Sequence, residues 1–342
     1  MRVGSQVART GIREVARRAG VSVGTVSNVL NRPDLVAEAT RDRVRSAITE
    51  LGFVRNETAR MLRQGPSARI GAPRALGMVV ENVTNPYFTD VGQGAEAAMN
   101  AAGVDAIWCT SDSSAAKEQR CLDFLAEQRA AGVLLMPVDD DPAPLARLRE
   151  RGMAAVLVDR DIPGFCSVRV DHVLGGALAV SYLLGRGHQR IALVTGVPEP
   201  EPYRDRRLGA EQAMRRAASG ELLIVSRPDL TIAEGGKAAQ RLLRRTELPS
   251  AVFCANDLLA IGLVNELLRA GVKVPAEIAV IGYDDIDLAS TAVVPLTTVH
   301  QPRHQLGWIA TELALTEATA TGGHKHQQIL LAPSLVVRES TE

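Results

Sequence analysis

The sequence predicts an α-helical headpiece followed by an α/β body of two doubly wound lobes. Up to about Arg63 the apolar residues recur only at helical spacing. From Leu76 onward, short apolar runs, which we expect to be strands, alternate with amphipathic stretches, a pattern typical of a parallel sheet covered by helices on both faces. The runs are LGMVV (76–80), VDAIWC (104–109), GVLLM (132–136), AAVLV (154–158), IALVT (191–195), AVFC (251–254) and IAVIG (278–282). This second region spans roughly 265 residues, too many for one standard α/β unit, so we expect two similar lobes.

Charge is distributed unevenly along this chain of 342 residues, whose formal net charge is zero. Residues 1–75 contain 14 arginines and 6 acidic residues, a net charge of +8 that the remainder balances. A basic front on an acidic body indicates a polyanionic partner for the front. The first residues lack the apolar core of a signal peptide, and no long uncharged apolar run follows. We therefore expect a cytoplasmic protein that does not enter a membrane.

The front segment shows the pattern of two short helices joined by a tight turn. Apolar residues recur at i, i+3, i+4 and i+7 from Ile12 to Ala19, and Gly20 follows as a helix stop. Ser22 is a favourable N-cap for a second helix. The inward stripe of that helix consists of Val26, Val29 and Leu30. Its outward face carries small residues of weak helix propensity, namely Val23, Gly24, Ser27 and Asn28.

A third apolar stripe, from Val44 to Leu51, predicts a supporting helix that ends before Gly52. Two short helices around a glycine turn, with a third behind them, form a helix-turn-helix unit, which lays its second helix in the major groove of DNA. A small structural bundle is the alternative. An exposed face of glycine, serine and asparagine beside arginines favours DNA binding over that alternative.

Metal or redox chemistry is not expected. The four cysteines include no pair at CxxC spacing and are interpreted as free thiols: Cys109, Cys121, Cys166 and Cys254. His300 and His304 lie four residues apart without an evident third ligand. His324 and His326 lie in a glycine-rich loop and are expected to be solvated. We predict neither a metal site nor a cofactor.

The front segment resembles the DNA-binding headpiece of the lactose-repressor (LacI/GalR) family. The run IREVARRAGVSVGTVSNVLNRPDLVAEATRDRVRSAITELGFVRNETARMLR meets nearly every fixed position of the family pattern DVAxxAGVSxxTVSxVLN…V…TRxRVxxAxxxLGYxPNxxAxxLR. Further family motifs follow in order along the body, among them NPYF, VDR, GHQRIALVTG, ANDLLAIG, VIGYDD and PLTTVHQP. The resemblance therefore covers practically the whole chain.

The resemblance implies a headpiece over residues 1–63, a linker over 64–75 and an effector-binding body over 76–342. It places the base-reading side chains at Val23, Gly24 and Asn28. Backbone-contacting or supporting positions fall at Thr25, Ser27 and Asn31. Gly24 has no side chain with which to read a base, and asparagine at position 28, where known members carry arginine or histidine, favours adenine.

Residues 56–63, NETARMLR, match the hinge helix of the family. Eight residues are too few for a stable isolated helix, so folding on DNA is expected. Asn56 is placed to cap this helix, and Ala59 and Leu62 share one face, from which Leu62 wedges into the minor groove. Packing of Met61 and Leu62 on the core is the alternative. The linker is longer than the family leads us to expect.

The resemblance also implies a body like that of periplasmic sugar-binding proteins, with a ligand between two lobes. The first lobe is expected over about 76–173 plus 301–330, and the second over about 174–300 plus 331–342. Ligands of open α/β sheets bind at the carboxyl ends of strands. Polar and aromatic residues at such ends suit a polyol, and we predict this effector site: Asn85, Tyr87, Phe88, Asp171, Arg206, Leu230, Asn256, Asp284 and Gln301.

Two departures from the family affect the ligand. Leu230 stands where several members place a stacking aromatic ring, and Arg303 stands where an aromatic is found in the family. Arg303 either faces an acidic or phosphorylated ligand or is a plain surface charge, and the surface interpretation is favoured.

The sequence thus predicts a sequence-specific DNA-binding transcriptional regulator, a repressor controlled by a small-molecule effector such as a sugar. The partners are double-stranded operator DNA and a second copy of the chain, because the family reads pseudo-palindromic operators. The chain ends shortly after LVVRES without a further heptad helix, so a dimer and not a tetramer is expected. A solute-binding component of a sugar transport system is the alternative. An enzyme is not expected, since the sequence contains no GxSxG, Walker or HExxH motif.

Overall fold

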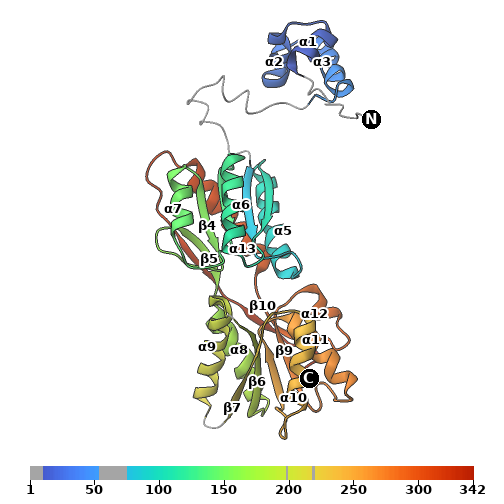
Figure 1. Cartoon of the computed structure of the whole chain (residues 1–342), viewed down its shortest axis with the longest axis vertical. Helices are drawn as coiled ribbons and strands as arrows, with labels where there is room; N and C mark the ends of the chain where they lie inside the picture. The colour runs from blue at the N-terminus through green and yellow to red at the C-terminus, as the bar shows by residue number, and fades with distance from the viewer. Residues whose placement is uncertain (1–10, 54–74, 198, 218–219) are drawn as a thin grey trace, which may run out of the picture. The chain divides into compact units, whose positions relative to one another are not determined.

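The computed structural model describes residues 11–53, 75–197, 199–217 and 220–342. The chain divides into two compact units, residues 1–71 and 72–342. Each unit is described by itself below, and Figure 1 gives the labels of the helices and strands.

The first unit is a three-helix headpiece made of α1 (Ile12–Ala19), α2 (Val23–Asn31) and α3 (Glu38–Glu50), with a short 3-10 turn, η1 (Pro33–Leu35), before α3. Gly20 ends α1 in the left-handed conformation at φ 66°, and its N–H donates to the last carbonyls of the helix. Ser22 caps α2 by accepting a hydrogen bond of 3.0 Å from the Thr25 N–H. The predicted helix stop and N-cap are therefore confirmed.

The core of the headpiece lies between the three helices. Val15, Val26 and Val44 contribute one fully buried side chain from each helix. Leu30 and Ile48 pack against this cluster from its rim. The inward stripe predicted for α2 is therefore confirmed, and the opposite face of that helix stays available for other contacts.

The first lobe of the body contains a parallel sheet in the order β11-β5-β4-β3-β1-β2. Its strands are β1 (Ala75–Val80), β2 (Asp105–Thr110), β3 (Gly132–Leu135), β4 (Ala154–Val158), β5 (Cys166–Val170) and β11 (Gln328–Leu331). Helices α5 (Pro86–Ala101) and α13 (Arg303–Thr319) pack on one face of the sheet. Helices α6 (Ala115–Glu127) and α7 (Ala143–Glu150) cover the other face. Nearly continuous apolar strands are the consequence of this two-sided burial.

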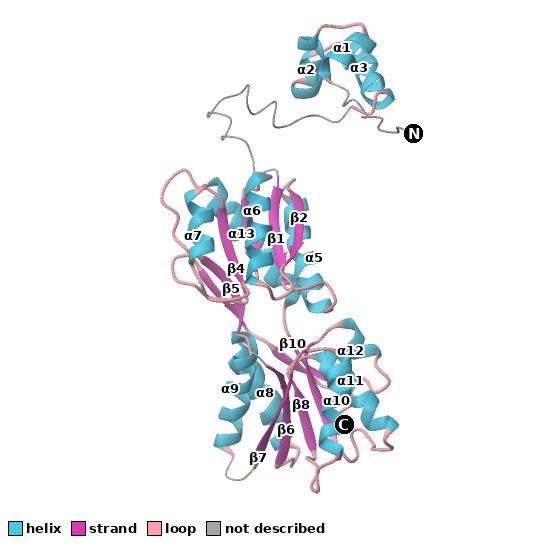
Figure 2. Ribbon diagram, viewed as in Figure 1, coloured by secondary structure: helices cyan, strands magenta, loops and turns pink. Residues whose placement is uncertain are grey.

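The second lobe repeats the plan, with strands in the order β12-β10-β9-β8-β6-β7. They are β6 (Arg190–Gly196), β7 (Glu221–Arg227), β8 (Ala251–Cys254), β9 (Ala279–Asp284), β10 (Thr297–His300) and β12 (Ser334–Val336). Only the β10–β12 pairing is antiparallel among the pairs described. Helices α8 (His172–Gly185) and α9 (Glu201–Arg216) cover one face, and α10 (Ile232–Leu243) and α11 (Asp257–Arg269) the other, while the short α12 (Asp287–Thr291) follows β9. Figure 2 shows both sheets between their helices.

Three segments connect the lobes. The chain passes from β5 to α8 at Asp171, returns from β10 to α13 at Gln301, and crosses again between β11 and β12. The lobes therefore share one continuous covalent framework, and a ligand between them contacts segments that belong to both. The predicted class, a helical headpiece with a two-lobed α/β body, is confirmed.

Glycine brings α8 and α9 unusually close together at one point. A Cβ on Gly176 would lie 1.9 Å from the carbonyl oxygen of Arg206, and a Cβ on Gly209 would lie 1.9 Å from that of Val173. Only residues without a side chain permit this approach. This close packing fixes the position of Arg206 along α9 relative to the first turn of α8.

Among the residues that the structure describes, no helix has both the length and the apolar character needed to cross a membrane.

Candidate functional site: a polar cavity between the lobes

A cavity of about 100 Å³ lies between the two lobes. The first lobe contributes residues that follow the carboxyl ends of β1 to β4, namely Glu81, Ser111, Ser113, Met136, Pro137, Val138, Val158, Asp159 and Arg160, together with Tyr87 and Phe88 of α5. The second lobe contributes Pro200, Pro202, Tyr203 and Arg206 at the beginning of α9. The location agrees with the rule that open α/β sheets bind ligands beyond the carboxyl ends of their strands.

Asp159 is the acidic centre of this cavity. It follows β4 in the left-handed conformation, at φ 58°, an uncommon backbone state for a residue with a side chain. Its Oδ2 accepts a hydrogen bond of 2.5 Å from the Tyr87 hydroxyl, and its Oδ1 lies 3.2 Å from Nε2 of His172. Burial raises the pKa of Asp159, but His172, Tyr87 and Arg206 outweigh burial and lower the pKa to about 2. The carboxylate is therefore charged at neutral pH.

His172 joins the two lobes through both of its ring nitrogens. Burial lowers the pKa of His172, and this effect outweighs the neighbouring Asp159, so the ring is neutral at pH 7. The hydrogen-bond network assigns the tautomer. Nε2–H donates to Asp159, whereas Nδ1 accepts from the Tyr283 hydroxyl at 3.0 Å and from Nε of Arg206 at 3.4 Å. Asp159 belongs to the first lobe and the other partners to the second.

Arg206 is the buried cation of the cavity. Its Nη1 donates to the Ala255 carbonyl oxygen at 2.5 Å and lies 3.5 Å from Oδ1 of Asp284. The guanidinium group stacks over the Tyr283 ring, 3.8 Å from its centroid, and over the Tyr203 ring at 4.6 Å. These contacts restrict the guanidinium group, because each buried contact reduces the rotamer freedom of the side chain.

Asp284 accepts hydrogen bonds from two neighbouring amide side chains. Gln301 Nε2 donates to Oδ1 at 2.7 Å, and the Asn85 side chain donates from the first lobe. Burial raises the pKa of Asp284 to about 6, against the opposing effects of Arg206, Gln301 and Arg303. Within the described residues, Oε1 of Gln301 is buried without a hydrogen-bond partner.

A second ion pair crosses between the lobes at the rim of the cavity. Arg160 follows β4 and is 7% exposed, and its Nη1 lies 3.2 Å from Oε2 of Glu201, the first residue of α9. Any change in the distance between the lobes at this point must stretch or shorten the Arg160–Glu201 pair.

The structure brings six of the nine predicted effector residues together. Tyr87, Phe88 and Arg206 line the cavity, and Asn85, Asp284 and Gln301 form the hydrogen-bonded group beside Arg206. The other three do not line it. Asp171 caps α8 by accepting from the Leu174 N–H at 2.8 Å. Asn256 caps α11 and donates to the Leu230 carbonyl oxygen at 3.0 Å.

Several cavity residues were not predicted, above all Asp159, Arg160 and Tyr203. Asp159 and Arg160 directly follow the run AAVLV, which was predicted to be a strand. Their position at a strand end is the signal that selected Asn85 and Asp284, so the same rule was able to find them. Tyr203 lies on α9, the helix that follows β6, just as Tyr87 lies on α5, the helix that follows β1.

The helix-turn-helix face was predicted to read DNA, and the described part of it is open. Val23 is 37% exposed, and Gly24 and Asn28 are exposed as well. Thr25 and Ser27 are half-buried, which suits the supporting positions given to them. The base-reading roles themselves stay predictions. The side chain of Asn31 and the hinge residues Asn56, Ala59 and Leu62 lie outside the described residues.

Two expectations about charged and polar side chains need correction. His324 and His326 are not solvated, since their side chains are only 14% and 26% exposed and both lie against Cys166. Arg303 is neither a free surface charge nor a group that lines the cavity. Its guanidinium group pairs with the Asp90 carboxylate of α5 in the first lobe.

A helix-turn-helix headpiece and a two-lobed body with a polar cavity between the lobes define a ligand-responsive DNA-binding regulator. Comparison with known proteins identifies the family. Residues 11–56 match the bacterial regulatory proteins of the lacI family, and residues 180–341 match the periplasmic binding protein-like domain. The chain belongs to the LacI family of bacterial regulatory proteins. It is a transcriptional regulator controlled by an effector, and not an enzyme or a transport component.

Two characterised relatives cover almost the whole chain. The HTH-type transcriptional repressor PurR of Photobacterium profundum is 34% identical over 337 residues, which cover 97% of this chain and 98% of the relative. The ribose operon repressor of Escherichia coli (strain K12) is also 34% identical, over 96% of this chain and 99% of its own.

Solved structures of similar fold also match. The lac repressor dimer bound to operator and the anti-inducer ONPF is 25% identical, with a TM-score of 0.79, over 98% of this chain and 99% of its own. A LacI family regulator from Enterococcus faecium with bound ribose is 27% identical, with a TM-score of 0.73. It covers 78% of this chain and 98% of its own.

Proposed function

We propose that this protein is a repressor that binds a pseudo-palindromic operator as a homodimer in the cytoplasm and responds to a small sugar bound between its lobes. The observation that carries the proposal is the cavity, in which a charged carboxylate and a fixed guanidinium group lie beside aromatic rings. Planar charged groups hydrogen-bond to neighbouring hydroxyls of a sugar, and aromatic rings cover its C–H faces.

Two of the similar proteins favour a monosaccharide. The ribose operon repressor among the relatives and the ribose bound by the Enterococcus faecium protein support a pentose. Ribose is therefore the first ligand to test.

The predicted effector residues take three roles in this proposal. Tyr87, Phe88 and Arg206 contact the sugar, and Asn85, Asp284 and Gln301 hold Arg206 and the crossing segments in position. Asp171, Leu230 and Asn256 shape the surrounding turns. Asp159 and Arg160 are added to the ligand-contacting group.

Control of DNA binding follows from the contacts that cross between the lobes. A ligand that bridges Asp159 and Arg206 favours one distance between the lobes, and it shifts the equilibrium only if it binds that state more tightly. The headpiece proposal rests on Val23, Gly24 and Asn28 for base contacts and on Thr25, Ser27 and Asn31 for support. The hinge residues Asn56, Ala59 and Leu62 join them when operator DNA is bound.

The test is a calorimetric titration of the full chain with ribose, other pentoses, hexoses and nucleosides, combined with operator binding measured at fixed salt. We expect one sugar of monosaccharide size to bind and to change operator affinity. Arg160→Met is expected to weaken sugar binding. Arg204→Met, an exposed change on α9, serves as the matched control and is expected to bind like wild type. Sugar binding without any effect on operator affinity would contradict the proposal.

A further inference from the structure

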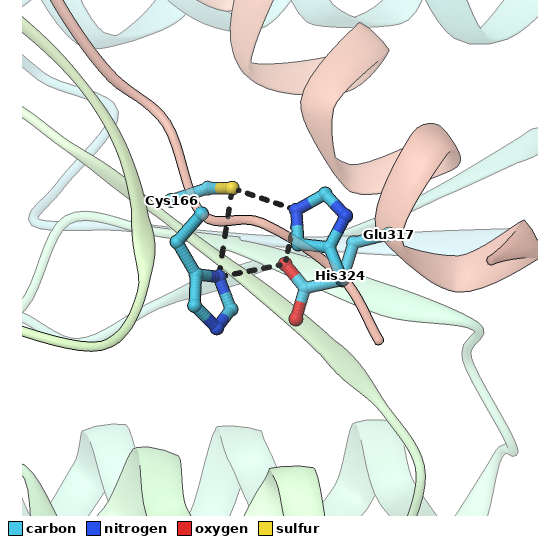
Figure 3. Close-up of side chains that lie close together, drawn as sticks. Cys166, Glu317 and His324 are labelled. Atoms are coloured by element: carbon cyan, nitrogen blue, oxygen red, sulfur yellow. Dashed lines mark hydrogen bonds and ion pairs between the residues drawn. The ribbon is translucent and has the colours of Figure 1, made fainter. Parts of the chain in front are cut away.

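Four side chains that bind metals in other proteins meet at one end of the first lobe: Cys166, Glu317, His324 and His326. Figure 3 shows the thiol, the carboxylate and the imidazole rings pointing toward a common centre. Cys166 begins β5, Glu317 lies in the last turn of α13, and the histidines lie in the segment between α13 and β11. This cluster is separate from the cavity, because β5 begins at Cys166 and only its far end leads to Asp171 and the lobe crossing.

The spacing of the four donor atoms fits a tetrahedral metal ion. Cys166 Sγ lies 3.1 Å from Nε2 of His324 and 3.7 Å from Nδ1 of His326. Both of these nitrogens lie 3.9 Å from Oε2 of Glu317, and all four donors fall within 4.8 Å of one another. Zinc bonds of about 2.0 to 2.3 Å at tetrahedral angles separate their donors by about 3.5 Å, so small side-chain shifts complete the site.

One buried oxygen of the cluster has no hydrogen-bond donor. Oε2 of Glu317 has no hydrogen-bond partner within the described residues, and its neighbours are the two imidazole nitrogens at 3.9 Å. An acceptor left in this state is costly, because its lost hydration is not replaced. A cation at the centre of the four donors would satisfy it.

The position of the histidines is set by the sheet. β11 pairs with β5 from Gln328 opposite Ser167, and the Ser167 N–H donates to the Gln327 carbonyl oxygen at 2.9 Å. The Gln327 N–H in turn points at Cys166 Sγ, 3.4 Å away. His326 therefore stands next to a residue whose backbone is held against Cys166.

We propose that Cys166, Glu317, His324 and His326 form a binding site for a divalent transition-metal ion, with Zn²⁺ as the best match. One thiolate, two imidazole nitrogens and one carboxylate oxygen are the donors that zinc accepts, and four protein ligands make a closed, structural site. On binding, the Cys166 thiol loses its proton to solvent and a sulfur–metal bond forms. The metal links the start of β5 to the end of α13 and to β11, from which the chain crosses to the second lobe.

The test uses the full chain after removal of metal with EDTA. Titration with Co²⁺ is expected to reach one ion per chain, with the near-ultraviolet thiolate charge-transfer band and the intense visible bands of tetrahedral cobalt. Zn²⁺ is expected to displace the cobalt and to raise the melting temperature by about 5 °C at saturating excess. A cobalt spectrum without a thiolate band would overturn the proposal without the need for any variant.

Variants then assign the ligands. The double change His324→Asn and His326→Asn is expected to weaken Zn²⁺ binding by about 100-fold or more, and Cys166→Ser is expected to remove the thiolate band. His304→Asn and Cys109→Ser are the matched controls, since His304 is exposed on α13 and Cys109 lies in β2. Unchanged zinc affinity in the histidine double variant, or an equal loss in the controls, would refute the assignment. The histidine variant alters partly exposed side chains, so its folding is checked by circular dichroism.

Discussion

Arg206 and Asp284 form a buried ion pair, with Nη1 3.5 Å from Oδ1 and each side chain only 3% exposed. The two residues come from different elements, α9 and the end of β9, and neither has access to bulk water. A charge in such a position is tolerated only while its partners remain, because its hydration has been removed. A single substitution at either residue is therefore expected to destabilise the fold around the cavity.

The first prediction concerns the loss of this cation. We expect Arg206→Met to lower the free energy of unfolding by about 3–5 kcal/mol, because Asp284 is left buried and unpaired. Urea denaturation followed by tryptophan fluorescence measures this, since Trp108 and Trp308 both lie in the body. Arg207→Met is the control. Arg207 is 39% exposed and pairs with Glu199 and Glu211, so a loss of only about 0–1 kcal/mol is expected. Equal losses in both variants would show that the buried Arg206–Asp284 pair does not contribute to stability.

The second prediction is a pH dependence of stability. Burial raises the pKa of Asp284 to about 6 in the folded protein, above its usual value of 3.8. Between these values the folded state holds more protons than the unfolded state, so the free energy of unfolding falls as the pH rises. Wild type is expected to lose stability relative to Asp284→Asn from about pH 4 to pH 6, by at most about 1.4 kcal/mol per pH unit, and the difference is expected to level off above that range. A difference that stays constant over the whole range would contradict the shifted pKa.

The third prediction tests the close approach of α8 and α9. We expect Gly176→Ala to cost about 1–3 kcal/mol or more, since its Cβ would meet the Arg206 carbonyl oxygen and push α9 away. Gly185→Ala lies on the same helix with nothing within 4 Å of its Cβ, and it is expected to be neutral or stabilising by up to about 1 kcal/mol. Chemical denaturation of both variants provides the comparison. If Gly176→Ala proves as mild as Gly185→Ala, the contact does not position Arg206.

The strands that sequence analysis predicted are chiefly those buried on both faces. β3, β4, β8 and β9 are fully buried and read as continuous apolar runs. β7, β11 and β12 were missed because they are partly exposed and carry mixed residues. β5 is almost wholly buried and was missed because Ser167 and Arg169 interrupt its apolar run. β10 was missed for another reason, since its buried Thr297 and Thr298 bond to polar partners such as Asp257 and Ser340.

Strand ends selected one part of the effector site, and the family pattern supplied another. Asn85 follows β1 and Asp284 ends β9, whereas Arg206 lies on α9 and matches the family pattern. Neither signal selected Tyr203, which also lies on α9. The cluster around Cys166 could not be predicted from the sequence for a related reason. Cys166 is far in sequence from the other three residues, and the unpredicted pairing of β11 with β5 brings His326 to Cys166.

The fourth prediction concerns the hinge segment, which matches the family pattern at residues 56–63. Leu62→Ala is expected to weaken operator binding much more than effector binding, because an apolar wedge in the minor groove acts only when DNA is bound. Fluorescence anisotropy with labelled operator and calorimetry with effector measure the two affinities separately. Comparable losses in both would mean that Leu62 packs on the body instead.

The fifth prediction addresses Gly24, the reading position without a side chain. A Cβ at Gly24 would meet only Ser22 Oγ, at an ordinary 3.6 Å, so alanine fits. Because alanine is the better helix former, Gly24→Ala is expected to stabilise the headpiece by up to about 1 kcal/mol. The family pattern predicts that position 24 faces a base edge. Apolar contact of the new methyl group with a thymine methyl is then expected to change the preference at one base pair by about 1–3 kcal/mol.

The measurement for Gly24 is anisotropy at fixed salt, with an operator selected from random DNA by the wild-type protein and with its single-base variants. Ser46→Ala, an exposed change on α3, is the control and is expected to keep the wild-type ranking. If Gly24→Ala also keeps that ranking while its headpiece is folded, position 24 does not face the bases. Base discrimination then rests on Val23 and Asn28 alone, the two exposed side chains that remain on the reading face of α2.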